Sequence, residues 1–134
     1  YFFLPGGMGI SFMKQWAGSG VDKNVMGPAF SFDQGILGAI GDAALGVKNT
    51  AHWSKDLDVP GNADFVKAFQ DEYGRLPSLY AAQGRGKFSF APNHHPVQDI
   101  YMREVVKEGD VVTNRMIGVA STDQSDVYGA DCKM

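Results

Sequence analysis

The spacing of apolar residues along the chain predicts alternating helices and strands. The clearest example is a helix from Asn62 to Tyr73, in which Phe65, Phe69 and Tyr73 recur on one face. Asn62 is expected to cap its start, and Gly74 is expected to end it in a left-handed conformation. Because start and stop signals are present at both ends, this helix is the best defined element of the sequence.

The N-terminal part follows the same alternation. A short apolar strand from Tyr1 to Leu4 leads through a glycine-rich turn into a helix that ends near Gly18. A second strand is expected over Val21 to Met26, and Ser31 with Gln34 resembles a capping box for the next helix. This order predicts an α/β fold with a mainly parallel sheet flanked by helices, whose ligand crevice lies at the carboxyl ends of the strands.

The rest of the chain is predicted to be richer in strands. Val47 to Trp53 is expected to be a strand, followed by a polar connection from Lys55 to Gly61. Lys87 to Phe90 is expected to form a short strand. Asp99 to Glu108 and Val111 to Ala120 then alternate as the two strands of a C-terminal β-hairpin.

Composition narrows the classes of function. The formal net charge of −3 and the pI near 5.5 give no electrostatic reason to expect nucleic acid as a partner. With 44% hydrophobic and 20% charged residues, the 134-residue chain is expected to fold as one globular domain. Cys132 is the single cysteine, so no disulfide can form within the chain.

The glycine-rich turn is the first candidate for ligand binding, through Pro5, Gly6, Gly7 and Met8. Glycines let the backbone approach a ligand closely, and the unpaired N–H groups of a helix start suit a carboxylate or a phosphate. The spacing fits neither G-x-G-x-x-G nor a Walker loop, so a nucleotide is not expected. The alternative is a plain turn between a strand and a helix.

The loop after the second strand is the other candidate for ligand binding. It would lie with the glycine-rich turn at the edge of the ligand crevice, at the carboxyl ends of the strands, and we call this edge the rim. The loop residues Ala29, Phe30 and Phe32 follow Gly27 and Pro28 directly. Two aromatic residues in such a loop either line the rim or pack beneath the following helix. Packing is expected for one of the two.

A catalytic or metal site is the weaker alternative. His94, His95 and Asp99 are the only cluster of plausible metal ligands, but adjacent histidines on an extended chain point to opposite faces. No nucleophile motif surrounds any serine or Cys132. We therefore expect no cofactor and no enzyme, and a small metal-dependent α/β enzyme using His94 and His95 remains the alternative.

Several short motifs occur in an order that resembles one family. They are P-x-N at residues 60–62, E-Y-G-R-L-P-S at 72–78 and Y-A-A at 80–82, with G-P and G-D-A-A-L-G upstream and R-G-K-F and Q-D-I-Y downstream. Together they resemble the solute-binding proteins of ABC transporters of the leucine/isoleucine/valine-binding type, in their C-terminal portion. The resemblance implies a type I periplasmic-binding-protein-like lobe. Residues 1–53 and 84–134 would form one lobe, and residues 54–83 the crossing and part of the opposite lobe.

The resemblance also implies a class of ligand. In relatives that bind α-amino acids, the loop after the G-P motif carries an acid that pairs with the substrate ammonium, and that position here is Ala29 or Phe30. Asp33, the nearest carboxylate, is placed to cap a helix. Without the acid, we expect a small carboxylate ligand that lacks the amine, with an aromatic acid as the leading choice. Tyr80 would lie close to the ligand on the hinge side.

Partners and location follow from the same resemblance. It implies an extracytoplasmic, periplasmic protein that delivers its ligand to an ABC permease, with a signal peptide removed or the chain a fragment. After Gln83, roughly 40 residues that relatives use for two helices are absent, and relatives supply the other wall of the site from upstream sequence. A homodimer could bury the apolar surface of an incomplete lobe. A ligand-sensing receptor lobe is the alternative function.

Overall fold

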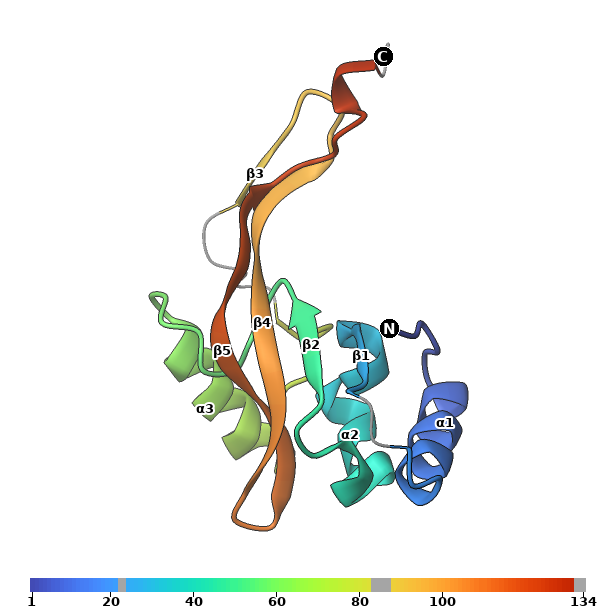
Figure 1. The fold of residues 1–134 in the computed structure, drawn as a ribbon. Helices are drawn as coiled ribbons and strands as arrows, with labels where there is room; N and C mark the ends of the chain where they lie inside the picture. Colours follow the sequence, from blue (N-terminus) through green and yellow to red (C-terminus); the bar gives the residue numbers. More distant parts are fainter. Residues whose placement is uncertain (22–23, 83–87, 132–134) are drawn as a thin grey trace.

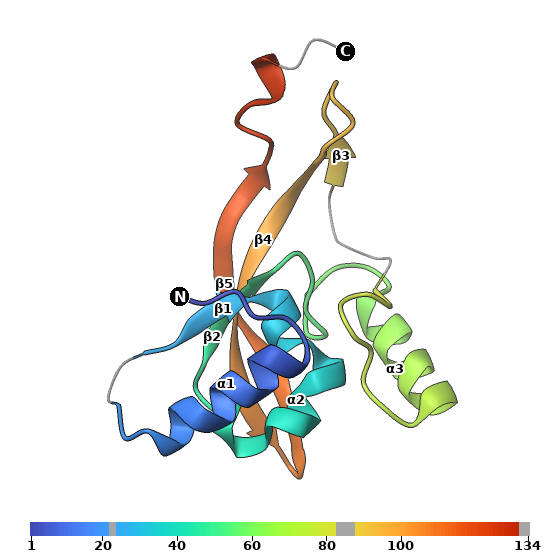
Figure 2. The same cartoon turned by 90° about the vertical axis from the view of Figure 1, so that its right-hand side faces the viewer.

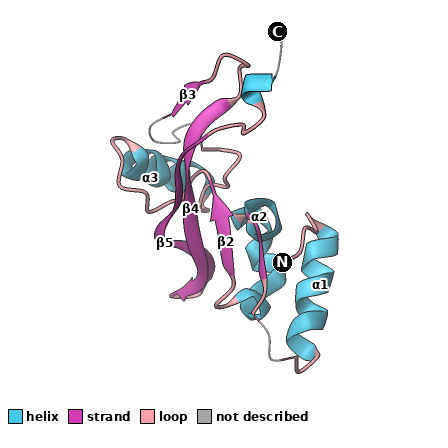
Figure 3. Ribbon diagram, turned by 45° about the horizontal axis from the view of Figure 1, so that its top comes forward, coloured by secondary structure: helices cyan, strands magenta, loops and turns pink. Residues whose placement is uncertain are grey.

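The computed structural model describes residues 1–21, 24–82 and 88–131 and has an α/β architecture (Figures 1 and 3). None of the described helices is long and apolar enough to cross a membrane. The elements in chain order are α1 (Gly7–Gly18), β1 (Met26–Pro28), the 3-10 turn η1 (Ala29–Phe32), α2 (Gln34–Ile40), η2 (Gly41–Ala44), β2 (Lys48–Ala51), α3 (Asn62–Tyr73), β3 (Phe88–Phe90), β4 (Pro96–Glu108), β5 (Val111–Gln124) and η3 (Gly129–Asp131).

The described strands form one mixed sheet built around β4. β1 and β2 are parallel, whereas β2, β3 and β5 each pair with β4 in antiparallel orientation. The predicted α/β class and the C-terminal hairpin are confirmed, and the parallel part of the sheet is the β1–β2 pair. The hairpin forms because the chain turns tightly at Gly109, whose φ of 59° suits such a turn, so that β4 and β5 run antiparallel.

The β4–β5 hairpin runs along the length of the molecule (Figure 1). Its turn lies beside the helices, and its other end extends past them and carries β3 and η3 (Figure 1). In Figure 1, α1 and α2 lie to one side of the hairpin and α3 lies to the other, and Figure 2 shows α3 standing apart from α1 and α2. The two groups of helices therefore pack against different parts of the same sheet.

Two apolar clusters hold these helices to the sheet. The first joins α1, α2 and η1 to the strands, through Met13, Phe32, Leu37, Ile40, Ala44, Val47 and Val105. The second joins β2 and the start of α3 to the segment before residue 83, through Ala29, Ala51, Trp53, Leu57, Leu79, Ala82 and Tyr101, with Phe65 and Val66 against it. η1 contributes Phe32 to one cluster and Ala29 to the other, so this short turn is fixed from both sides.

The N-terminal predictions need three corrections. Residues 1–4 are not a strand, because a single hydrogen bond, from Phe2 N–H to the Met26 carbonyl at 3.0 Å, joins them to β1. β1 begins at Met26 rather than at Val21, and residues 22–23 lie outside the described part. The capping-box prediction is also wrong, because Asp33, not Ser31, caps α2.

The bounds of α3 agree with the prediction, and Gly74 ends it with φ 64° as expected. Its start differs, because Gly61 with φ 80° is the N-cap and the Asn62 side chain makes no cap. Asn62 is buried instead and hydrogen bonds to the connection that precedes the helix. The strand predicted from Lys87 to Phe90 is present as β3 from Phe88, and Lys87 and Cys132 lie outside the described residues.

Candidate functional site

The turn before α1, predicted to bind ligand, leaves the first N–H groups of the helix without helical acceptors. Gly6 adopts φ 61°, and the Ile10 N–H donates to its carbonyl at 3.1 Å. The N–H groups of Gly7 and Met8 precede this first helical bond and so have no acceptor within the helix. The Met8 side chain is 62% exposed, and the N-cap residue Gly6 supplies no side-chain hydrogen bond to the helix start. Donors at this helix start are therefore available to an anion.

η1 divides its aromatic residues between the core and the surface. Phe32 is fully buried and packs edge-on against Phe2 at 5.7 Å between ring centroids. Phe30 is 40% exposed and meets the exposed Phe3 edge-on at 5.9 Å. Phe32 is thus the packing residue of the pair, and Phe30 with Phe3 forms the aromatic part of the rim. Ala29 is buried in the second apolar cluster.

Hydrogen bonds connect the predicted rim segments to one another. The Ser31 hydroxyl donates to the Leu4 carbonyl at 3.2 Å, which ties η1 to the residue before Pro5. The Leu79 N–H donates to the Asp33 carboxylate at 2.9 Å, which ties the end of η1 to the neighbour of Tyr80. Tyr80 itself is 67% exposed and lies in a turn rather than at the start of a helix. The structure thus joins the three segments that the sequence singled out.

A buried polar chain behind this rim was not predicted from the sequence. The Arg103 guanidinium, on β4, donates to Asn49 Oδ1 at 2.7 and 3.0 Å and to the Trp53 carbonyl at 3.2 Å. Asn49 donates to Asn114 Oδ1 at 2.8 Å, and Asn114 donates to the Phe32 carbonyl at 2.8 Å. The chain runs from the connection after β2 to η1. In the sequence, these hydrogen bonds are signalled by a polar residue at a position that faces the core, in β2, β4 and β5.

Burial changes the pKa of two side chains in this region. It lowers the pKa of Arg103 to about 10, and the charges of Asp33 and Asp56 partly oppose that change. Burial also raises the pKa of Tyr101, with a smaller contribution from the negative charge of Asp99. Arg103 therefore carries a buried positive charge at neutral pH, a short way behind η1.

The histidines considered for metal binding lie in the turn between β3 and β4. His94 has φ 63°, and His95 Nδ1 lies 3.3 Å from the Pro96 carbonyl. Asp99 accepts the Asp123 N–H at 2.9 Å. Among the residues that the structure describes, no group of three or more His, Cys, Asp or Glu side chains is arranged to hold a metal ion.

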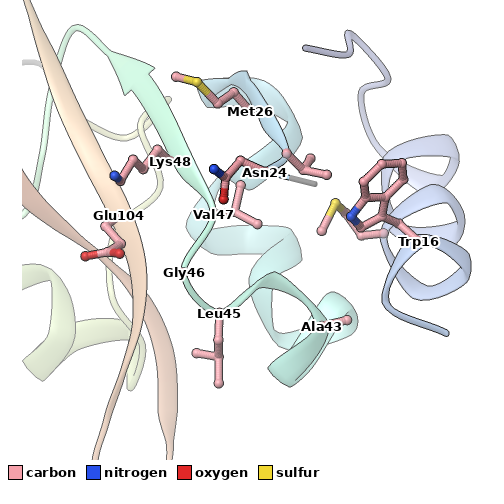
Figure 4. Close-up of a pocket in the computed structure, with 11 residues that line it drawn as sticks. Trp16, Asn24, Met26, Ala43, Leu45, Gly46, Val47, Lys48 and Glu104 are labelled. Atoms are coloured by element: carbon pink, nitrogen blue, oxygen red, sulfur yellow. The ribbon is translucent and has the colours of Figure 1, made fainter. Parts of the chain in front are cut away.

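A cavity of about 520 Å³ lies at the other end of the parallel strands (Figure 4). Its lining includes Asn24 and Met26 at the start of β1 and Lys48 at the start of β2. Figure 4 shows Trp16 on one side of it and Lys48 with Glu104 on the other. None of the predicted rim residues contributes to this lining, because the rim is at the carboxyl ends of β1 and β2.

Comparison with known proteins finds relatives among the periplasmic binding proteins. A family model for periplasmic binding proteins matches residues 1–85. The Leu/Ile/Val-binding protein homolog 6 of Brucella melitensis is 27% identical over 82% of this chain and 39% of its own length.

Two solved structures are similar over nearly the whole chain. An ABC transporter solute-binding protein from R. palustris, in complex with benzoate, has a TM-score of 0.81 and 27% identity, over 98% of this chain and 46% of that one. A second, from Rhodopseudomonas palustris BisB5 in complex with 3,4-dihydroxybenzoic acid, has a TM-score of 0.74 and 28% identity, over 91% and 45% of the two chains.

The chain spans less than half the length of each of these proteins. The Brucella alignment extends over 152 residues while using 82% of a 134-residue chain, so the relative has internal residues that this chain lacks. These matches and the fold agree, and the family model covers well over half of the sequence. The chain therefore belongs to the periplasmic binding proteins of type I, the family of the leucine/isoleucine/valine-binding proteins.

Proposed function

We propose that this chain forms one wall of the ligand site of an ABC transporter solute-binding protein, and that the ligand is an aromatic carboxylate. The observation that carries the proposal is the convergence of the three rim segments. The Ser31–Leu4 and Asp33–Leu79 hydrogen bonds fasten them to one another at the carboxyl end of β1. Such an end is where α/β sheets bind ligands.

The chemistry of the rim suits both parts of such a ligand. The start of α1 offers backbone N–H groups, and the positive end of the helix dipole favours a carboxylate. Phe30 and Phe3 present exposed aromatic surface that can pack edge-on against a benzene ring. Tyr80, two-thirds exposed, is the candidate on the hinge side.

The same rim disfavours an α-amino acid. η1 reads Ala-Phe-Ser-Phe and contains no acid. Asp33 follows it, but one carboxylate oxygen accepts the Gly35 N–H at 3.0 Å and the other accepts the Leu79 N–H at 2.9 Å. A ligand ammonium would therefore lose its hydration without gaining a carboxylate partner here, which costs binding free energy.

Two relatives support this class of ligand. The solved proteins at 27% and 28% identity were found with benzoate and with 3,4-dihydroxybenzoic acid. By the same analogy, the protein would work outside the cytoplasm and deliver its ligand to an ABC permease. The proposal also keeps the predicted division, with residues 54–83 reaching toward a second lobe that supplies the other wall.

A thermal-shift comparison tests the proposal. Benzoate and 4-hydroxybenzoate should raise the Tm of the protein, and leucine should leave it unchanged, because ligands that bind only the folded state stabilise it. Phe30→Ala should weaken the benzoate shift, while Phe88→Ala, which removes a similarly exposed phenylalanine on β3, should preserve it. A Tm shift with leucine and none with either aromatic acid would overturn the proposal.

A further inference from the structure

Asp33 occupies a position from which one carboxylate serves two separate segments. It lies between η1 and α2 and is only 6% exposed. Oδ1 accepts the Gly35 N–H at 3.0 Å, which caps α2. A helix cap needs no more than one side-chain oxygen. Oδ2 accepts the Leu79 N–H at 2.9 Å, from a residue 46 positions further along the chain.

The segment that Asp33 holds is the one that presents Tyr80. The Leu79 side chain is buried in the second apolar cluster, whereas Tyr80 projects into solvent. Ser78 completes a compact turn, because its hydroxyl accepts the Tyr80 N–H at 3.2 Å and its carbonyl accepts the Ala81 N–H at 3.1 Å. The bond to Asp33 is therefore a direct polar link between this turn and the other rim segments.

The carboxylate is itself held in place. Asn114 donates to the carbonyl of Phe32, the residue before Asp33, at 2.8 Å. Through Asn49 this bond continues to the Arg103 guanidinium, whose positive charge acts on Asp33. A buried polar group is costly without hydrogen bonds, and each carboxylate oxygen of Asp33 accepts one here. The hydrogen bonds on both sides of Asp33 therefore hold its carboxylate in one position.

We propose that Asp33 is a positioning residue of the ligand site, which holds Tyr80 in register with η1 and the start of α1 so that both sides contact one aromatic carboxylate. This inference rests on the proposed function above. The proposal gives Asp33 no direct contact with the ligand, because the residue is only 6% exposed and its two oxygens each accept a backbone N–H. Its effect on affinity is exerted through Tyr80.

Two substitutions separate the link from the cap. Asp33→Asn keeps one oxygen for Gly35 but places an amide N–H opposite the Leu79 N–H. Asp33→Ser keeps a good N-cap but has no second oxygen to reach Leu79. Asp126→Asn is the matched control, because Asp126, just after the end of β5, also accepts two hydrogen bonds, from the Asn93 side chain and the Tyr128 N–H.

The readout is benzoate affinity, measured by ligand-observed NMR titration so that weak binding is still detected. Both Asp33 variants should weaken binding by at least about tenfold, as expected if Tyr80 no longer lies where it contacts the ligand, and Asp126→Asn should change binding less than about twofold. In a Tyr80→Ala background, Asp33→Ser should weaken binding by less than about threefold, because the residue that it positions is already absent.

The outcomes distinguish this inference from the proposed function. If the wild-type protein does not bind benzoate, the proposed function fails and the inference falls with it. If the wild type binds and the Asp33 variants bind equally well, only the inference is overturned. Equal losses with and without Tyr80 would also overturn it, because they would show that Asp33 acts through overall stability.

Discussion

Asn62→Ser should destabilise the protein strongly, although serine is a good N-cap residue. Asn62 is 5% exposed and lies beneath the connection between β2 and α3. Its Oδ1 accepts the Trp53 indole N–H at 2.7 Å. Its Nδ2 donates to the carbonyls of Ser54, Lys55 and Leu57 at 3.2, 3.1 and 2.9 Å. A serine hydroxyl is too short to replace these bonds.

The expected magnitude follows from the groups left without partners. A buried donor or acceptor that loses its hydrogen bond costs about 1–3 kcal/mol, and carbonyl oxygens that keep another interaction cost less. With one indole N–H and the three carbonyls affected, the free energy of unfolding should fall by about 2–4 kcal/mol. If Asn62 were the N-cap, exchange for serine would cost almost nothing.

Urea unfolding followed by tryptophan fluorescence measures this difference, because Trp53 is 2% exposed and is bonded to Asn62. Asn24→Ser is the matched control, since Asn24 is exposed on the surface and should tolerate the same exchange. A stability loss for Asn62→Ser no larger than that of Asn24→Ser would refute the assigned role.

Three further substitutions test the packing and the surface by the same unfolding assay. Leu37→Ala removes a fully buried core residue and should cost about 2–5 kcal/mol, whereas Leu45→Ala, at a position 41% exposed, should cost far less; equal losses would contradict the first apolar cluster. Gly27→Ala should cost about 1–3 kcal/mol, because its Cβ would lie 2.9 Å from the Phe32 ring, and an unchanged midpoint would show that the ring can move. Asp71→Asn should leave the unfolding midpoint unchanged, because its ion pair with Lys67 is exposed, and a clear loss would contradict this.

The elements found from the sequence are those whose signals are local. α3 carries its apolar residues at helical spacing and ends at a glycine, and both features act within a few residues. The hairpin combines alternation with a glycine that adopts positive φ at the turn. The polar connection predicted from Lys55 to Gly61, which precedes α3, contains no helix or strand in the structure.

The features that were missed depend on contacts between distant residues. Asn62 has the right chemistry for a cap, but the carbonyls gathered in the preceding connection compete for its side chain, and only the folded chain brings them there. The bond between Asp33 and Leu79 joins residues 46 positions apart and has no sequence signal. Residues 1–4 read as a strand, but one bond to β1 is too little pairing for a ladder.

The ligand rim stays a prediction. Two of its segments were chosen from their expected place between a strand and a helix, and Tyr80 from the family resemblance; in the structure, hydrogen bonds of Ser31 and Asp33 join the three segments. Which aromatic residue faces solvent could not be read from the sequence, because Phe30 and Phe32 have equal hydrophobicity. The conformation of η1 decides it, since it turns Phe32 into the core and Phe30 outward.

The most direct test of the account is competition for the site at equilibrium. Labelled benzoate should bind the protein saturably in equilibrium dialysis, unlabelled 4-hydroxybenzoate should displace it, and a large excess of leucine should not. That result would agree with a rim that offers helix N–H groups and an aromatic pair but no free acid. Displacement of benzoate by leucine at comparable concentration, or saturable binding of labelled leucine alone, would contradict it.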